Sequence, residues 1–186
     1  MSIDSGIREK AKSVRMIMMD VDGVLTDGRI LYSADGAEIE AFSVRDGLGV
    51  RAAQRAGLLT AILTGRVSGA VARRAKELGI PEIHQGVSNK VETYETLLRR
   101  HGLTDEAVAY VGDDVNDLPL LARAGFSAAP ADAADEVKAN VAYVAARGGG
   151  RGAVREVIEL ILKAQGKWEL AMETRGSSPR EGEASS

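Results

Sequence analysis

The composition of this chain excludes several classes of protein. It has 186 residues, of which 45% are hydrophobic, 27% charged and 4% aromatic, and its formal net charge is −3. This length is enough for one domain with a sizeable core. The charge balance argues against nucleic acid or an anionic membrane surface as a partner, and the few aromatic residues offer little surface for stacking bases.

The chain contains no cysteine, which rules out a disulfide framework, a thiolate metal site and a cysteine nucleophile. Residues 1–6 carry an early acid and lack the apolar core of a signal peptide, and no stretch of about 18 apolar residues occurs. We therefore expect a cytoplasmic protein.

Taken in order, the chain begins with a polar, mixed segment at 1–13, which predicts a loose arm or a short helix. A buried strand follows at 14–20. Apolar residues then alternate with polar ones on both sides of Asp35-Gly36, which is a strong hairpin signal. We expect a small β-hairpin flap over residues 28–42.

The rest of the chain alternates between strand and helix patterns. The predicted strands cover 58–63, 82–84, 107–111, 125–128 and 141–144. The predicted helices cover 46–56, 67–78, 88–100, 133–138 and 153–164, with a short helix ending near 122. This alternation is typical of an α/β fold with a doubly wound, Rossmann-like parallel sheet and helices on both faces. We assign 1–168 to one domain and 169–186 to a polar, disordered tail.

The predicted helix at 67–78 has an apolar stripe at helical spacing that begins at Val67 and ends at Leu78. Arg74 interrupts this stripe. A guanidinium at such a position either reaches out to water or faces an interface or an anion.

Polar residues follow three of the predicted strands at their carboxyl ends. Asp20 and Asp22 end the first strand, and Thr64 and Asp113 each follow a later one. In a parallel sheet such ends meet at one edge, so we expect these side chains in one site. Two aspartates so close repel each other unless a cation lies between them, and Mg²⁺ prefers oxygen ligands. A turn without function is the plain alternative for Asp-x-Asp-Gly.

Four stretches resemble the motifs of the haloacid dehalogenase phosphatase superfamily, in the version found in 3-deoxy-D-manno-octulosonate 8-phosphate phosphatases. They are DVDGVLTDG at 20–28, Thr64-Gly65, Lys90 and GDDVND at 112–117. Lys90 lies in the first turn of a predicted helix, where the macrodipole disfavours a cation, so an anion should compensate it. The resemblance covers residues 14–168 and implies a capless enzyme that has only the hairpin as a flap.

The resemblance implies a role for each motif in phosphoryl transfer. Asp20 is the nucleophile that forms an aspartyl-phosphate, and Asp22 is first the acid and then the base. Thr64 and Gly65 hold a phosphoryl oxygen, and Lys90 neutralises the phosphate and the nucleophile. Mg²⁺ is the implied cofactor. Its expected ligands are the carboxylates of Asp20 and Asp113 and the backbone carbonyl of Asp22, with Asp114 and Asp117 acting through water.

Three further stretches carry the finer resemblance. SVRDGLGVR at 43–51 resembles a substrate-contacting segment, Arg66 and Arg74 match substrate-contacting arginines, and GGGRGAVRE at 148–156 resembles a C-terminal signature that can reach a neighbouring subunit. Several arginines suit a substrate with a carboxylate and a phosphate. The implied substrate-binding residues are Asp22, Ser43, Val44, Arg45, Asp46, Gly47, Arg51, Gly65, Arg66, Arg74, Lys90 and Arg151.

The implied activity is hydrolysis of 3-deoxy-D-manno-octulosonate 8-phosphate in lipopolysaccharide precursor synthesis, by a homotetramer in which a neighbouring subunit covers the active site. Ser43 and Leu48 depart from the family pattern and leave a nine-carbon substrate, such as 2-keto-3-deoxynononate 9-phosphate, as an alternative. A non-catalytic sugar-phosphate binding protein is a second alternative, against which the intact motif residues argue. For any single arginine, pairing with a surface acid is the plain alternative.

Overall fold

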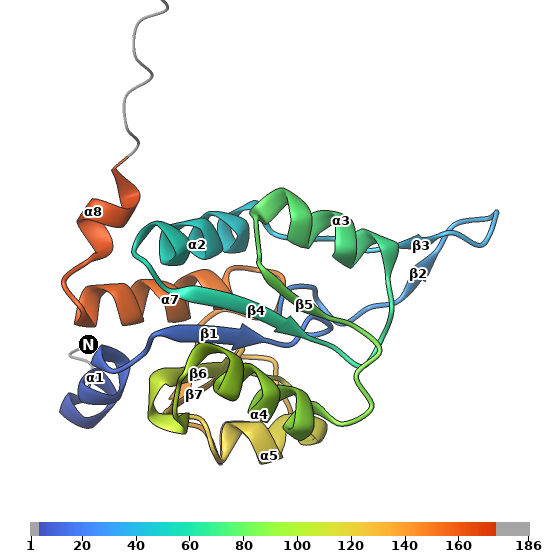
Figure 1. Cartoon of the computed structure of the whole chain (residues 1–186). Coiled ribbons are helices and arrows are strands. Elements are labelled where there is room, and N and C mark those ends of the chain that lie inside the picture. The colour runs from blue at the N-terminus through green and yellow to red at the C-terminus, as the bar shows by residue number, and fades with distance from the viewer. Residues whose placement is uncertain (1–3, 174–186) are drawn as a thin grey trace, which may run out of the picture.

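A parallel sheet forms the centre of the computed structural model, which describes residues 4–173 (Figure 1). Its six strands lie in the order β5-β4-β1-β6-β7-β8, and all neighbouring strands are parallel. They are β1 (Met16–Met19), β4 (Leu59–Leu63), β5 (Glu82–His84), β6 (Val108–Val111), β7 (Phe126–Ala129) and β8 (Tyr143–Val144). The predicted α/β fold is confirmed.

Helices cover both faces of the sheet (Figure 1). One layer contains α1 (Ser5–Lys12), α2 (Val44–Arg55), α3 (Gly69–Leu78), α7 (Ala153–Ala164) and α8 (Trp168–Met172). The other contains α4 (Lys90–His101), α5 (Leu118–Leu121) and α6 (Asp135–Lys138). Two short 3₁₀ turns, η1 (Asp105–Ala107) and η2 (Val115–Asp117), flank β6. Ile17 and Met19 of β1 pack into the first layer, and Met16 and Met18 pack into the second. Because both faces are buried, the strand is a continuous apolar run.

Capping side chains shift three helix starts away from their predicted positions. The Ser43 hydroxyl accepts the first N–H groups of α2, which therefore begins two residues early. Ser68 caps α3, so Val67 lies before the helix and is 75% exposed rather than part of the apolar stripe. Asn89 caps α4, so this helix begins at Lys90 rather than at residue 88.

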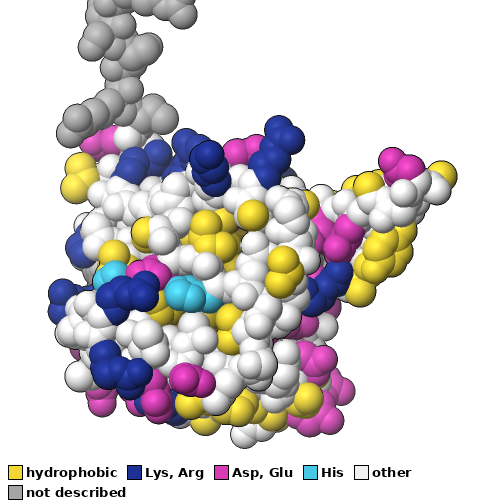
Figure 2. All heavy atoms as spheres, turned by 45° about the vertical axis from the view of Figure 1, so that its right-hand side comes forward, with side chains coloured by type: hydrophobic (Ala, Val, Ile, Leu, Met, Phe, Trp, Pro, Cys, Tyr) yellow, Lys and Arg dark blue, Asp and Glu magenta, His cyan; other side chains and the backbone are white. Residues whose placement is uncertain are grey.

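The predicted flap is present as a short two-stranded antiparallel hairpin, β2 (Leu31–Tyr32) and β3 (Glu38–Ile39). It projects from the body beyond the carboxyl ends of the strands (Figure 1). Its apolar side chains face solvent in this chain, as the hydrophobic strip along the projection in Figure 2 shows.

The two ends of the described chain are more ordered than the sequence pattern suggested. Asp4 caps α1, so the short-helix alternative holds there. The assignment of 169 as the start of a disordered tail is wrong, because α8 continues to Met172. Trp168 and Ala171 are buried, and Arg55 Nε donates to the carbonyl of Ala171 at 2.7 Å. The rest of the predicted tail, 174–186, lies outside the described residues. Between residues 4 and 173, no helix is both long enough and apolar enough to cross a membrane.

The strand order places the site. The chain builds β4 and β5 on one side of β1 and then crosses to build β6, β7 and β8 on the other. The carboxyl ends of β1, β4 and β6 are therefore neighbours, at the point where the direction of strand addition reverses. Asp20 and Asp22 follow β1, Thr64 follows β4 and Asp113 follows β6, whereas Lys90 begins α4 after β5.

Candidate active site

Asp20 directly follows β1 and is 6% exposed. Its N–H donates to the Val111 carbonyl, which extends the strand pairing by one residue, and its Oδ1 accepts the Val21 N–H at 2.7 Å. The chain then turns sharply, because the Val21 carbonyl accepts N–H groups from residues 24–26. Asp22 lies half-buried within this turn. The two aspartates are thus held by backbone contacts.

Lys90 connects the ends of β1 and β6. Its ammonium lies 2.7 Å from Asp20 Oδ2 and 2.7 Å from Asp117 Oδ1, and its side chain is only 8% exposed. Burial lowers the pKa of Lys90, but the two carboxylates outweigh that effect, so its net shift is upward. The anion expected beside a lysine in the first turn of a helix is therefore present twice over.

Asp117 is fully buried and anchors the loop after β6. Its Oδ1 also accepts the Tyr110 hydroxyl at 2.7 Å, and its Oδ2 accepts the Asp113 N–H at 3.1 Å. A Cβ atom on Gly112 would lie 2.5 Å from Asp117, so glycine is required there for close approach. The motif pattern did not single out Tyr110. A tyrosine inside a buried strand needs a hydrogen-bond partner, and that requirement was the available signal.

Three carboxylates meet at this edge of the sheet. Single oxygens of Asp20, Asp113 and Asp117 all lie within 4.8 Å of one another. Burial, reinforced by the Asp117 charge and opposed by Lys90, raises the pKa of Asp20 to about 6. Burial and the neighbouring aspartates raise the pKa of Asp113 to about 7. An all-oxygen cluster with excess negative charge suits a hard divalent cation.

Thr64 and Arg66 extend the site from the end of β4. Thr64 is buried and its Oγ1 accepts the Arg66 N–H at 3.3 Å. The Arg66 guanidinium lies 3.5 Å from Asp22 Oδ1, and it also pairs with Glu38 of the flap. Glu40 lies nearby, and burial raises its pKa. Sequence reasoning missed Glu38 of β3 and Glu40, which directly follows that strand, although a spacing of two residues in an extended chain places side chains on one face.

A glycine-rich loop at 148–152 closes the side of the site next to the Asp22 turn. The Gly150 N–H donates to the Val24 carbonyl at 3.0 Å. A Cβ atom on Gly149 would lie 1.8 Å from the carbonyl oxygen of Gly23. Only glycine permits this backbone-to-backbone contact.

Known proteins resemble this chain over most of its length. A family model for haloacid dehalogenase-like hydrolases matches residues 79–158. A 3-deoxy-D-manno-octulosonate 8-phosphate phosphatase from Escherichia coli strain B is 44% identical over 169 residues, which is 91% of this chain and 90% of that protein. The chain belongs to the 3-deoxy-D-manno-octulosonate 8-phosphate phosphatase family.

Solved structures of this phosphatase family share the fold. The enzyme from Yersinia pestis has a TM-score of 0.87 and 43% identity, with 89% of each chain covered. The enzyme from Moraxella catarrhalis, solved with a magnesium ion, a phosphate ion and a KDO molecule, has a TM-score of 0.86 and 44% identity. That match covers 88% of this chain and 94% of the other.

Several residues expected to bind the phosphatase substrate are engaged elsewhere in the single chain. We correct the expectation for Asp46, which is 1% exposed and accepts the Gly152 N–H at 3.0 Å and the Arg155 N–H at 2.8 Å. Burial raises the pKa of Asp46, partly offset by these amides. Gly47 is also buried, and it makes room for the guanidinium of Arg74, which would lie 2.4 Å from a Cβ atom there.

The other residues that were expected to contact the substrate or the metal lie at the edge of the candidate active site or outside it. Ser43 caps α2, and Val44 is 80% exposed. Arg51 donates to the Glu77 carbonyl at 2.6 Å on the outer surface. Arg151 lies 3.9 Å from Asp27, beside the site. Arg45 is exposed and lines a separate groove with Arg155. Asp114 is exposed, and its side chain accepts only the Val115 N–H among the described hydrogen bonds.

The two histidines of the phosphatase chain lie away from this site, side by side on one face (Figure 2). Both contact the buried carboxylate of Glu82, His84 at 3.0 Å and His101 at 2.8 Å, and Arg100 joins them. Burial raises the pKa of Glu82, but the hydrogen bonds from these three residues outweigh it and the net shift is downward. This cluster ties edge strand β5 to the end of α4.

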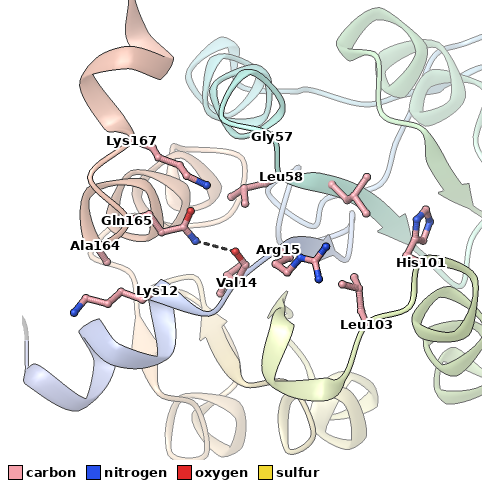
Figure 3. Close-up of a pocket in the computed structure, with 11 residues that line it drawn as sticks. Lys12, Val14, Arg15, Gly57, Leu58, His101, Leu103, Ala164, Gln165 and Lys167 are labelled. Atoms are coloured by element: carbon pink, nitrogen blue, oxygen red, sulfur yellow. Dashed lines mark hydrogen bonds between the residues drawn. The ribbon is translucent and has the colours of Figure 1, made fainter.

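A pocket of about 600 Å³ lies at the opposite edge of the sheet, at the amino ends of β1 and β4 (Figure 3). Its lining includes the basic residues Arg15 and Lys167, the imidazole of His101 and the apolar side chain of Leu58. None of the motif residues lines it. This pocket therefore does not coincide with the candidate active site, which is located instead by the order of the strands in the sheet.

Proposed function

We propose that this chain is a phosphoric monoester hydrolase that uses Mg²⁺ to convert 3-deoxy-D-manno-octulosonate 8-phosphate to the free sugar acid and phosphate, a step of lipopolysaccharide precursor synthesis. The observation that carries the proposal is the meeting of Asp20, Asp113 and Asp117 within 4.8 Å, with Lys90 bonded to two of them. The activity named for relatives at 44% identity supports the choice of substrate.

The residues fit Mg²⁺. The carboxylates of Asp20 and Asp113 and the backbone carbonyl of Asp22 would hold the ion, and all are oxygen ligands. Asp117 fits a supporting role, because both of its oxygens already accept hydrogen bonds. When bound, the ion offsets the repulsion between a carboxylate nucleophile and a phosphate dianion. The magnesium ion in the Moraxella catarrhalis relative supports this assignment.

Side chains of this protein carry the proposed chemistry. A carboxylate oxygen of Asp20 attacks phosphorus, the bond from phosphorus to the ester oxygen breaks, and Asp22 gives a proton to the leaving oxygen. Water then attacks the aspartyl-phosphate and gives a proton to Asp22, and phosphate leaves. Lys90 holds Asp20 and reduces the charge on the site. The Thr64 hydroxyl and the Gly65 N–H hold a phosphoryl oxygen.

Arg66 is our choice for recognition of the substrate anion, because its guanidinium lies 3.5 Å from Asp22 Oδ1. Its present partners, Asp22 and Glu38, are acids that an anionic substrate would replace as ligands. Arg45, Arg51, Arg74 and Arg151 stay predictions.

We further propose a homotetramer in which a neighbouring subunit covers the open crevice. The exposed apolar flap supports it, since Leu31 is 43%, Ile39 49% and Tyr32 68% exposed. Light scattering of the wild-type chain and of Tyr32→Glu tests this, with a smaller assembly expected for the variant. The cytoplasmic location likewise stays a prediction, to be checked by cell fractionation.

The decisive test of function is phosphate release with Mg²⁺ from the eight-carbon substrate, the nine-carbon analogue and simple sugar phosphates. We expect a preference of about a hundredfold, about 2.7 kcal/mol in transition-state binding, for the eight-carbon acid. Preference for the nine-carbon acid would keep the mechanism and change the substrate. No release from any ester would favour a binding protein.

A further inference from the structure

The N-terminus of α7 is capped by the side chain of Asp46, which lies 106 residues before Gly152 in the sequence. Gly152, the residue before α7, has no side chain with which to cap the helix. Asp46 of α2 takes that role, with Oδ2 3.0 Å from the Gly152 N–H and Oδ1 2.8 Å from the Arg155 N–H. Both carboxylate oxygens are used, and the residue is 1% exposed. Asp46 therefore fixes where the glycine-rich loop at 148–152 ends.

This loop presses directly on the turn that carries Asp22. A Cβ atom on Gly150 would lie 2.7 Å from the carbonyl carbon of Thr26, and one on Gly149 would lie 1.8 Å from the Gly23 oxygen. The Gly150 N–H also donates to Val24 at 3.0 Å. Asp22 lies between the end of β1 and this segment, so the backbone on both sides of Asp22 is held by contacts.

The other side of the loop is tied to the strand end that carries Asp113. Asp132 Oδ1 accepts the Gly149 N–H at 2.8 Å. Two residues later, the Ala134 N–H donates to the Asp113 carbonyl at 2.8 Å. A Cβ atom on Gly23 would lie 1.9 Å from Asp113 Oδ2. The loop thus contacts the Asp22 turn directly and is linked to the Asp113 segment through Asp132. Glycine at 149 and 150 lets the backbone of the loop meet the backbone of the turn.

We propose that Asp46 is a positioning residue for Asp22, acting through the loop at 148–152. Asp46 touches no reacting atom. It holds the loop, the loop holds the turn, and the turn holds the carboxylate that gives its proton to the leaving oxygen. This inference rests on the proposed function and adds a residue to it. Displacement of a catalytic group by about 1 Å is enough to cost a large factor in rate.

Two substrates with different leaving groups can distinguish a positioning role of Asp46 from a role in stabilising the fold. A sugar-acid phosphate releases an alkoxide that needs a proton from Asp22, whereas p-nitrophenyl phosphate releases a stable phenolate that does not. The measured quantity is kcat/KM, which reports on the steps up to loss of the leaving group. A loss of folded protein would lower kcat/KM equally for both esters.

The variant is Asp46→Asn, which keeps the volume but places an amide N–H₂ against two N–H donors. We expect kcat/KM for the sugar-acid phosphate to fall by about ten- to a hundredfold, and that for p-nitrophenyl phosphate by less than about threefold. The matched control is Asp135→Asn, an exposed aspartate paired with Lys138, for which both values should stay at the wild-type level.

A second variant guards against misfolding of the first. Gly149→Ala puts a methyl group where the loop meets Gly23, and the same selective loss is expected from it. Equal losses for the two esters, or no loss for either, would overturn the positioning role while leaving the proposed function intact. A wild-type chain that hydrolyses neither ester would overturn the proposed function and this inference with it.

Discussion

The ammonium group of Lys90 lies 2.7 Å from a carboxylate oxygen of Asp20, and both side chains are 8% exposed. The residues are 70 positions apart in the sequence. Lys90 also bonds to Asp117, so one cation serves two buried acids. Because of this ion pair, the charge of Asp20, the proposed nucleophile, affects the free energy of unfolding.

Lys90→Met should lower both activity and stability. Without the ammonium group of Lys90, the carboxylates of Asp20 and Asp117 stay buried but lose their cationic partner. Breaking a buried ion pair typically costs about 3–5 kcal/mol in the free energy of unfolding. In the presence of a chelator near pH 7.5, we expect the free energy of unfolding to fall by about that amount. The loss should shrink near pH 5, where Asp20 takes up a proton. Urea titrations at the two pH values check this.

The control for that measurement is Lys163→Met, an exposed lysine paired with Glu159 at 2.7 Å. Its effect should stay within about 0.5 kcal/mol at both pH values. Equal effects of the two substitutions would show that Lys90 is not a buried partner of Asp20.

Asp20→Asn should abolish turnover without unfolding the chain. The amide has nearly the volume of the carboxylate but cannot attack phosphorus, so phosphate release should fall by at least about a thousandfold. Without metal, the melting temperature should stay the same or rise, because a buried repelling charge is removed. Acid-quenched wild-type protein should carry a phosphoryl group that the variant lacks. Retained turnover would rule out the covalent intermediate.

Mg²⁺ should bind more weakly in acid. In the metal-free fold the pKa values of Asp20 and Asp113 are raised, to about 6 and about 7. Raised acid pKa values mean that the folded state holds extra protons, so their contribution to stability is lost as pH rises from about 4 through 7. Mg²⁺ must displace those protons. Its affinity should therefore rise by about tenfold or more between pH 5.5 and 7.5.

Calorimetric titration of Mg²⁺ at the two pH values checks this, with Asp113→Asn as the comparison. That variant should bind Mg²⁺ more weakly and with less dependence on pH, since one titrating ligand is gone. An affinity that is flat across this range in the wild-type chain would contradict a site built from these two carboxylates.

Trp168→Ala should destabilise the fold, although α8 lies at the end of the described chain. The indole is 9% exposed and packs under the guanidinium of Arg155, 4.5 Å from its ring centre. We expect a loss of about 2–4 kcal/mol in the free energy of unfolding. Leu170→Ala, on the exposed side of the same helix at 72%, should change it by less than about 0.5 kcal/mol. Similar losses for both would mean that α8 does not pack as described.

The sequence by itself was enough to predict the parallel sheet and the edge of the sheet at which the candidate active-site residues lie. A strand such as β1 shows as a local apolar run, and Asp20, Asp22, Thr64 and Asp113 follow such runs directly. Parallel strands bring their carboxyl ends to one edge, so a local pattern was enough to predict which residues meet. The geometric role of Lys90 was also readable, because a cation in the first turn of a helix calls for an anion.

Only the tertiary structure decided which partners the remaining residues have. Asp46 stands in a segment that resembles a substrate contact, yet its carboxylate caps a helix that begins 107 positions later, at Ala153. Glu38 pairs with Arg66, and Tyr110 donates to Asp117. The spacing of apolar residues along the chain does not predict either contact. The hydrophobic periodicity of a helix or strand predicts which of its faces a side chain lies on. The residue that this side chain contacts on another element depends on how the layers pack. That is why the strand-end residues were predictable and their supporting contacts were not.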